Sequence, residues 1–220
     1  MKHLMKRSTL LLPLLLSLVL AAGCDFRGLR GNGRIKTESR PVSAFTRVKA
    51  GGYYSIQWQP GQPALTVRTD ENLLSHITTR MDGDVLKIEL EGQIAPTDGI
   101  KIALSSPSLK GTDLSGAVKL QAQPLGGDTF ALETGGATKV TLSGKVRRLL
   151  ASLTGASKLQ AKDLGAETVE ISVTGAGKAD VCASELLRAA ITGAGEVSYS
   201  CNPKSVEKKI TGAGKIHPRD

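Results

Sequence analysis

Apolar and polar residues alternate along several short stretches of the chain. Val169, Ile171 and Val173 are apolar with polar residues between them, and the same alternation occurs within 149–153 and 187–191. A period of two places one row of side chains inside the protein and the other row outside, which is typical of a β-strand and not of a helix. The pattern therefore predicts an all-β fold.

These strands belong to a repeat. A short motif, most often Thr-Gly-Ala-x-Lys, follows the alternating stretches at steps of 18 to 20 residues. The alanines of its copies are Ala117, Ala137, Ala156, Ala176, Ala194 and Ala213. A unit of about 19 residues is too short for two helices and a turn. It fits one coil of a single-stranded parallel β-helix, a solenoid in which each strand pairs with the same strand of the next coil.

The body of the protein is predicted to span residues 34–220, with regular repeats over 111–216. Residues 34–110 contain strands at 65–68, 85–90 and 100–104 but no clear copy of the motif. This part is interpreted as wider, less regular coils or as an N-terminal cap on the same rod. Terminal units of a solenoid must be atypical, because an exposed end offers unpaired strand edges.

The chain begins with a predicted lipoprotein signal peptide at residues 1–23. Basic residues precede an apolar run at 10–22, which is too short to span a bilayer. Leu20-Ala21-Ala22-Gly23-Cys24 resembles the lipobox of bacterial lipoproteins. The resemblance implies cleavage before Cys24 and attachment of acyl chains such as palmitate to this residue. Ordinary cleavage beside an incidental cysteine is the alternative. Residues 24–33 are glycine-rich and read as a flexible tether.

The predicted location follows from this N-terminus. The protein is expected to be exported and lipid-anchored to the bacterial cell envelope, facing the periplasm or the surface. Asp25 resembles the signal that keeps enterobacterial lipoproteins in the inner membrane. The N-terminal lipid is then the predicted contact with the membrane, since no other stretch approaches transmembrane length.

Several motifs together resemble the bacterial head GIN domain family, also named auto-transporter adhesins. They are the serial Ser/Thr-Gly-Ala-x-Lys units, Arg40-Pro41-Val42-Ser43-Ala44-Phe45, Thr69-Asp70-Glu71-Asn72-Leu73-Leu74 and Asn202-Pro203-Lys204. The resemblance covers roughly residues 33–216 and implies a parallel β-helix on an envelope protein. Glu196 departs from it by replacing the usual Lys. The family name suggests adhesion by analogy.

The motif sequences give little support for catalysis or cofactor binding. Thr174-Gly175-Ala176-Gly177 before Lys178 lacks the earlier glycine and the following Ser or Thr of a phosphate-binding loop. Neither a Gly-x-Ser-x-Gly nucleophile motif nor a cluster with metal-ligand spacing occurs in the sequence. No cofactor, metal or nucleic-acid partner is predicted. His76 and His217 lie in unrelated settings and are interpreted as surface residues.

A carbohydrate-active enzyme is the alternative function, because many β-helical proteins cleave polysaccharides. Such enzymes need carboxylates that converge on one face. The acids of the repeats are scattered among outward and turn positions, and no pair is evident from the sequence. They include Asp163, Glu167, Glu170, Asp180 and Glu185.

The repeat also predicts a row of lysines along one outer edge, one per coil. Its members are Lys119, Lys139, Lys158, Lys178 and Lys215, with Glu196 in the remaining coil. This candidate binding stripe could contact an anionic glycan, a lipid surface or an envelope protein; otherwise it is a solvated face that resists edge-on aggregation. The mature chain has a net charge of +6, which is consistent with either interpretation. Tyr53, Tyr54 and Trp58 form a second candidate patch, unless they belong to the core.

Cys182 and Cys201 lie one repeat apart in a compartment where disulfides persist. Adjacent coils bring them near bonding range. Counted from the motif threonines, however, their offsets are 8 and 9, so one side chain is expected to point inward and the other outward. The spacing therefore leaves a disulfide open. The predicted protein is a lipid-tethered, non-catalytic structural or interaction module of the envelope.

Overall fold

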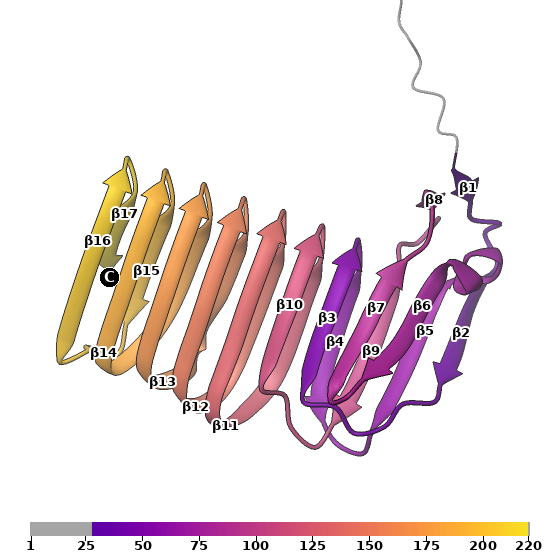
Figure 1. The fold of residues 1–220 in the computed structure, drawn as a ribbon, viewed down its shortest axis with the longest axis horizontal. Coiled ribbons are helices and arrows are strands. Elements are labelled where there is room, and N and C mark those ends of the chain that lie inside the picture. Colours follow the sequence, from indigo (N-terminus) through magenta and orange to yellow (C-terminus); the bar gives the residue numbers. More distant parts are fainter. Residues whose placement is uncertain (1–27, 220) are drawn as a thin grey trace, which may run out of the picture.

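The computed structural model describes residues 28–219, and Cys24 and Asp25 lie outside them. Most of this part, 72%, is β-strand, and it contains one short 3-10 helix, η1 (Glu71–His76). The strands form a solenoid with about 20 residues per turn, which confirms the predicted fold class. Figure 1 shows the coils stacked along the long axis, from the N-terminal end to the C-terminal end. Within residues 28–219, no helix is long and apolar enough to cross a membrane.

Each regular coil has two faces joined by the Gly-Ala bend of the repeat. A strand approaches the bend on what we call the A face, and the chain leaves the bend on the B face. The strands of this region are β10 (Gly111–Gly116), β11 (Lys119–Gly136), β12 (Lys139–Gly155), β13 (Lys158–Gly175), β14 (Lys178–Gly193), β15 (Glu196–Ser200), β16 (Ser205–Gly212) and β17 (Lys215–Pro218). Neighbouring coils pair in parallel, motif against motif.

The core is formed by side chains that repeat at the same place in each coil. On the B face, the residue after each motif lysine or Glu196 points inward and stacks on its counterparts in the neighbouring coils. The buried residues of this stack are Leu120, Val140, Leu159, Ala179, Val197 and Ile216. Full burial of a Val or Leu side chain stabilises the fold by about 1.5–3 kcal/mol. The parallel register therefore aligns the apolar side chains of successive coils, and the burial of these side chains in turn stabilises that register.

The bends allow no side chain at their glycine position. Gly155 has a φ of +90°, and a Cβ atom built there would lie 2.7 Å from the carbonyl oxygen of Gly136 in the previous coil. Gly136 meets Gly116 at the same distance. Such contacts are closer than packed atoms tolerate, so the stacking of the bends requires glycine in successive coils.

The N-terminal region uses the same two faces in a different order. β3 (Arg47–Gly52) pairs in parallel with β10 on one side and with β7 (Val85–Leu90) on the other. β4 (Ser55–Pro60) lies in the same way between β11 and β9 (Lys101–Ser106). The coil formed by β3 and β4 is therefore inserted between two coils that come later in the sequence (Figure 1).

Antiparallel strands close the N-terminal end. β5 (Ala64–Asp70) runs antiparallel to β9, and β2 (Ile35–Arg40) runs antiparallel to β5. On the other face, β6 (Ile77–Asp82) runs antiparallel to β7. Residues 34–110 were expected to form irregular coils or a cap. They form two coils of parallel strands, and beyond these coils lie the antiparallel strands at the N-terminal end of the rod.

The first strand is attached at the edge where the bends lie. β1 (Leu29–Arg30) pairs in parallel with β8 (Ile94–Ala95), which stands between β7 and β9 in the place of a Gly-Ala bend. Figure 1 shows both strands beyond this edge at the N-terminal end of the rod. We call the side of the solenoid that carries the bends the bend edge.

The C-terminal end lacks an antiparallel closure. Within residues 28–219, β16 pairs with β14 alone. Lys208 occupies a position of the repeat that is apolar in earlier coils. Its Nζ donates to the Ile216 carbonyl at 3.2 Å and lies 5.2 Å from the centre of the Tyr199 ring. A lysine at this place disfavours pairing with a further strand, which is how many edge strands avoid aggregation.

Candidate functional site

The motif lysines form one row on the B face, immediately after the bend. Lys119 pairs with Lys139, Lys139 with Lys158, and Lys158 with Lys178. Glu196 and then Lys215 continue the row to the C-terminal end. The lysine side chains are exposed. Because adjacent coils are about 4.8 Å apart, the row from the first to the last of these lysines spans about 24 Å. We call it the lysine row.

Charge compensation within the row is local. Lys178 donates to Glu196 at 2.8 Å, and His217 Nε2 lies 3.2 Å from the other carboxylate oxygen of Glu196. The hydrogen bond to Glu196 raises the pKa of Lys178, and the bond from Lys178 lowers the pKa of Glu196. Among the described residues, no ion pair within 4 Å compensates Lys119, Lys139 or Lys158. The N-terminal half of the row therefore presents uncompensated positive charge.

The edge opposite the bends, which we call the far edge, carries acids among its basic residues, although Lys145 and Lys162 there have no ion pair within 4 Å among the described residues. Arg147 there lies 2.8 Å from Asp128 and 3.7 Å from Glu167, in the coils on either side. Lys204 lies 2.8 Å from Glu185. The bend edge therefore has a larger local excess of positive charge than the far edge. Long-range attraction to an anion depends on such an excess.

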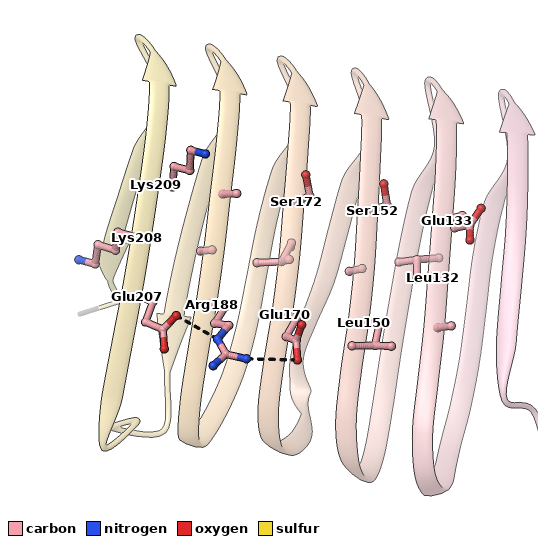
Figure 2. A pocket seen from close by; sticks show the side chains of 15 residues that line it. Leu132, Glu133, Leu150, Ser152, Glu170, Ser172, Arg188, Glu207, Lys208 and Lys209 are labelled. Atoms are coloured by element: carbon pink, nitrogen blue, oxygen red, sulfur yellow. Dashed lines mark hydrogen bonds and ion pairs between the residues drawn. The ribbon is translucent and has the colours of Figure 1, made fainter.

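A shallow groove of about 640 Å³ crosses the A face over β11, β12, β13, β14 and β16. One row of outward residues runs along it, Ala131, Leu150, Glu170, Arg188 and Glu207. Figure 2 shows Arg188 between the two glutamates. Its Nε donates to Glu207 at 2.9 Å, and its Nη1 lies 3.8 Å from Glu170.

The interpretation of the acids as scattered was wrong for Glu170. Positions 170, 188 and 207 follow the repeat step, so the register aligns Glu170, Arg188 and Glu207. The two glutamates are two coils apart, about 9.6 Å at the usual strand spacing. Their side chains are 42% and 56% exposed and share one guanidinium.

The N-terminal aromatic residues belong mainly to the core. Tyr54 and Trp58 are each 3% exposed, and Trp58 Nε1 donates to Ser106 Oγ at 3.0 Å. Burial raises the pKa of the Tyr54 hydroxyl. Tyr53 is half-buried and donates to the Ile94 carbonyl. Of the two alternatives left open by the sequence, packing describes these residues better than a binding patch.

Cys182 and Cys201 are joined by a disulfide, with their Cα atoms 5.2 Å apart. The partner of Cys182 in the β-ladder is Ser200, one residue short of the cysteine. Cys201 has a φ of +72°, which turns the chain after β15 back toward the neighbouring coil. The left-handed conformation of Cys201 explains how two cysteines whose positions after the motif differ by one residue come within bonding distance.

The described residues contain no group of three or more His, Cys, Asp or Glu placed to hold a metal ion. His76 and His217 lie far apart in the fold, and His76 Nδ1 contacts the Glu91 carbonyl at 3.1 Å. Among the described residues, the lysine row and the A-face groove are the candidate features that the proposals below concern.

Comparison with known proteins is decisive for the family. A sequence model described as "Putative auto-transporter adhesin, head GIN domain" matches residues 44–203. The chain belongs to the head GIN domain family. The first five copies of the motif and most of the N-terminal coils lie within the matched part. Among curated proteins, no match was found.

Solved structures share the fold of this chain. A "putative adhesin" from Bacteroides fragilis superimposes with a TM-score of 0.68 at 22% identity, covering 87% of this chain and 100% of its own. A "putative lipid binding protein" from Parabacteroides distasonis gives 0.56 at 21% identity, covering 87% and 99%. A "putative adhesin" from the same organism gives 0.59 at 19% identity, with the same coverage. The family name points to a protein of the cell envelope or surface.

Proposed function

We propose that the protein is a non-catalytic, adhesin-like interaction module of the bacterial cell envelope, attached through acyl chains on Cys24, and that the lysine row binds an anionic partner. The single observation that carries this proposal is the register of the row, which places one exposed lysine in each of four consecutive coils. The lipobox sequence before Cys24 supports the anchor.

The spacing of the row suits a polyanion or a charged surface better than a single small ion. One exposed lysine contributes little to binding, because water and salt screen its charge. Several lysines held on a rigid scaffold act together, since each additional contact is intramolecular once the first has formed. Binding through the row is therefore expected to weaken steeply as salt concentration rises.

The test compares two triple variants of the mature chain, purified in non-ionic detergent, on immobilised heparin as a generic polyanion. One carries Lys119→Gln, Lys139→Gln and Lys158→Gln. The control carries Lys145→Gln, Lys162→Gln and Lys209→Gln, which remove the same charge from exposed positions outside the lysine row. We expect the first variant to elute at clearly lower salt than the wild type and the control to lose much less. Equal loss in both variants would show that net charge, and not the row, causes retention.

The alternative of a carbohydrate-active enzyme has one observation in its favour, the groove that contains Glu170, Arg188 and Glu207. Product analysis after incubation with neutral and acidic polysaccharides tests it. Cleavage by the wild type that disappears in Glu170→Gln and in Glu207→Gln would replace the proposal of a non-catalytic module. Glu133→Gln is the matched control, because Glu133 lines the same groove outside this row.

A further inference from the structure

We infer that the anionic partner of the lysine row is a membrane surface. The long axis of the solenoid then lies along the membrane, with the bend edge facing the bilayer. This inference rests on the proposed function and names the partner of the same site. It follows from three properties of the described residues: where the first strand is attached, how firmly it is held, and where the uncompensated lysines lie.

The first strand is attached at the bend edge. Leu29 N donates to the Gln93 carbonyl and Gly31 N donates to the Ala95 carbonyl, both at 2.9 Å. Residues 91–100 occupy the place that a Gly-Ala bend occupies in other coils, between β7 and β9. The chain that leads to Cys24 therefore leaves the body on the same side as the motif lysines, and not on the far edge.

The attachment is fixed by side chains as well as by the backbone. Asn72 Nδ2 donates to the Arg30 carbonyl at 2.8 Å and Asn72 Oδ1 accepts from Asn32 N at 3.0 Å. Asp70, which is fully buried, accepts from Gly33 N at 2.8 Å. We call this arrangement of Asp70 and Asn72 the clasp. Because the clasp holds residues 30–33 on the body, only a short segment separates the body from the anchor.

The length of that segment limits the distance between body and bilayer. Five residue steps lead from Cys24 to Leu29, and an extended chain spans at most about 3.6 Å per step, or about 18 Å in total. This is less than the length of the lysine row, about 24 Å at the usual spacing of strands. A body held this close to an anionic bilayer through its bend edge has the row within the range of the surface potential.

The charge distribution selects one orientation of the rod. Lys119, Lys139 and Lys158 on the bend edge lack an acidic partner within 4 Å among the described residues. The far edge also has lysines without an ion pair, Lys145 and Lys162, but there the acids Asp128, Glu167 and Glu185 lie among the basic residues. An anionic leaflet therefore attracts the first edge more strongly than the second. An upright rod, standing on its N-terminal end, would leave most of the row in solution.

The test is lysine labelling of the lipidated full-length mature chain on vesicles, read by mass spectrometry. One set of vesicles contains phosphatidylglycerol and phosphatidylcholine, and the other contains phosphatidylcholine alone. We expect Lys119, Lys139 and Lys158 to react about fivefold more slowly on the anionic vesicles. Lys145 and Lys162 are internal references on the far edge, and their rates are expected to be the same on both.

Each alternative result overturns the inference. Equal rates for the row on both vesicles would mean that the tether alone, or an upright rod, determines the orientation. Protection of Lys145 and Lys162 would mean that the opposite edge faces the membrane. Retention on heparin without protection on vesicles would leave the proposed function standing, with an anionic glycan as the better partner. Loss of both would remove the proposed function as well.

Discussion

The two regions of the solenoid are stabilised in different ways. In residues 111–218 the same contacts recur in every coil, namely parallel pairing, an apolar inner stack and a bend glycine packed on the bend glycine of the previous coil. In residues 28–110 many contacts occur once. Arg40 donates to two backbone carbonyls, Trp58 donates to a buried serine, and Asp70 accepts hydrogen bonds from two segments.

The difference has a practical meaning for substitutions. In the regular coils the effect of a change should depend on its place within the coil, because neighbouring coils are nearly equivalent. In the N-terminal region it should depend on the individual residue. The sequence motifs shared with the family fit this view, because Arg40, Asp70 and Asn72 lie in them and all three bind backbone atoms.

The largest expected effect is that of Gly155→Ala in the stacked bends. The new Cβ would lie 2.7 Å from the Gly136 carbonyl oxygen at a φ of +90°. We expect the free energy of unfolding to fall by about 3 kcal/mol, since strain and overpacking combine. Urea unfolding followed by far-UV circular dichroism measures the change.

Gly92→Ala is the matched control in the N-terminal region. Gly92 also has a positive φ, +75°, but a Cβ there would have no atom within 4 Å. The expected loss is about 1 kcal/mol, the cost of the backbone conformation alone. Similar losses at Gly92 and Gly155 would show that the close stacking of the bends contributes nothing of its own.

A second test concerns the last coils, where the regular region also depends on a single contact. The disulfide between Cys182 and Cys201 closes a segment with a sequence separation of 19 residues. Replacing both cysteines by serine should lower the free energy of unfolding by about 3 kcal/mol, mainly by relaxing the unfolded chain. Dithiothreitol should shift the wild type by a similar amount and leave the double variant unchanged. A double variant as stable as the oxidised wild type would contradict the prediction.

Asp70→Asn removes the charge of the clasp with almost no change in shape. Asp70 accepts from Gly33 N, Thr97 N and Thr97 Oγ1, each at 2.8 Å. Hydrogen bonds to a charged group are stronger than neutral ones, so we expect a loss of about 2 kcal/mol at neutral pH. The fluorescence of Trp58, the single tryptophan, reports on this region during urea unfolding.

The same variant has a pH signature. Burial disfavours the charged form of Asp70, but the hydrogen bonds from Thr97 and Gly33 outweigh it and hold the pKa of the carboxyl below its usual value. A lowered pKa in the folded state stabilises the protein fully above the unfolded value of about 3.9 and progressively less as the pH falls through the folded pKa. The stability difference between wild type and Asp70→Asn should therefore shrink below about pH 4. A constant difference would rule out the charge as its cause.

The smallest expected effect has the opposite sign. Thr134 is 6% exposed and lies in the inner stack where the neighbouring coils have Leu114 and Leu153. No described residue accepts or donates a hydrogen bond at its hydroxyl. Thr134→Val should stabilise the protein by about 1 kcal/mol, because an unpaired buried polar group is removed. Thr138→Val is the control, since the Thr138 hydroxyl donates to Ser157 at 2.9 Å and its loss should destabilise.

Local periodicity was sufficient to predict the regular coils and the lysine row. Alternation gave the inward and outward faces, and the step of the motif gave the register that places Lys139 beside Lys158. The insertion of β3 and β4 between later coils could not be predicted, because the pairing of Ser55 with Lys119 links residues far apart in sequence and no periodic signal joins them. The alignment of Glu170, Arg188 and Glu207 was predictable from their spacing.

The cysteine pair shows a second kind of limit. Counting from the motif assumes that every residue after it continues the strand, and Cys201 breaks this assumption with its positive φ. A single residue in a left-handed conformation changes which side the next atoms face, and residue spacing alone does not contain that information.

The inserted coil also imposes an order on folding during synthesis. Residues 47–60 emerge before either of the coils between which they lie, so β3 and β4 must wait until β9 and β11 have followed. Joining segments so distant in sequence is slow, because the intervening loop must close first. Once this step is complete, each later coil adds to a finished template at the cost of ordering about 20 residues. The protein should therefore fold as a slow nucleation at one end followed by rapid growth toward the C-terminus.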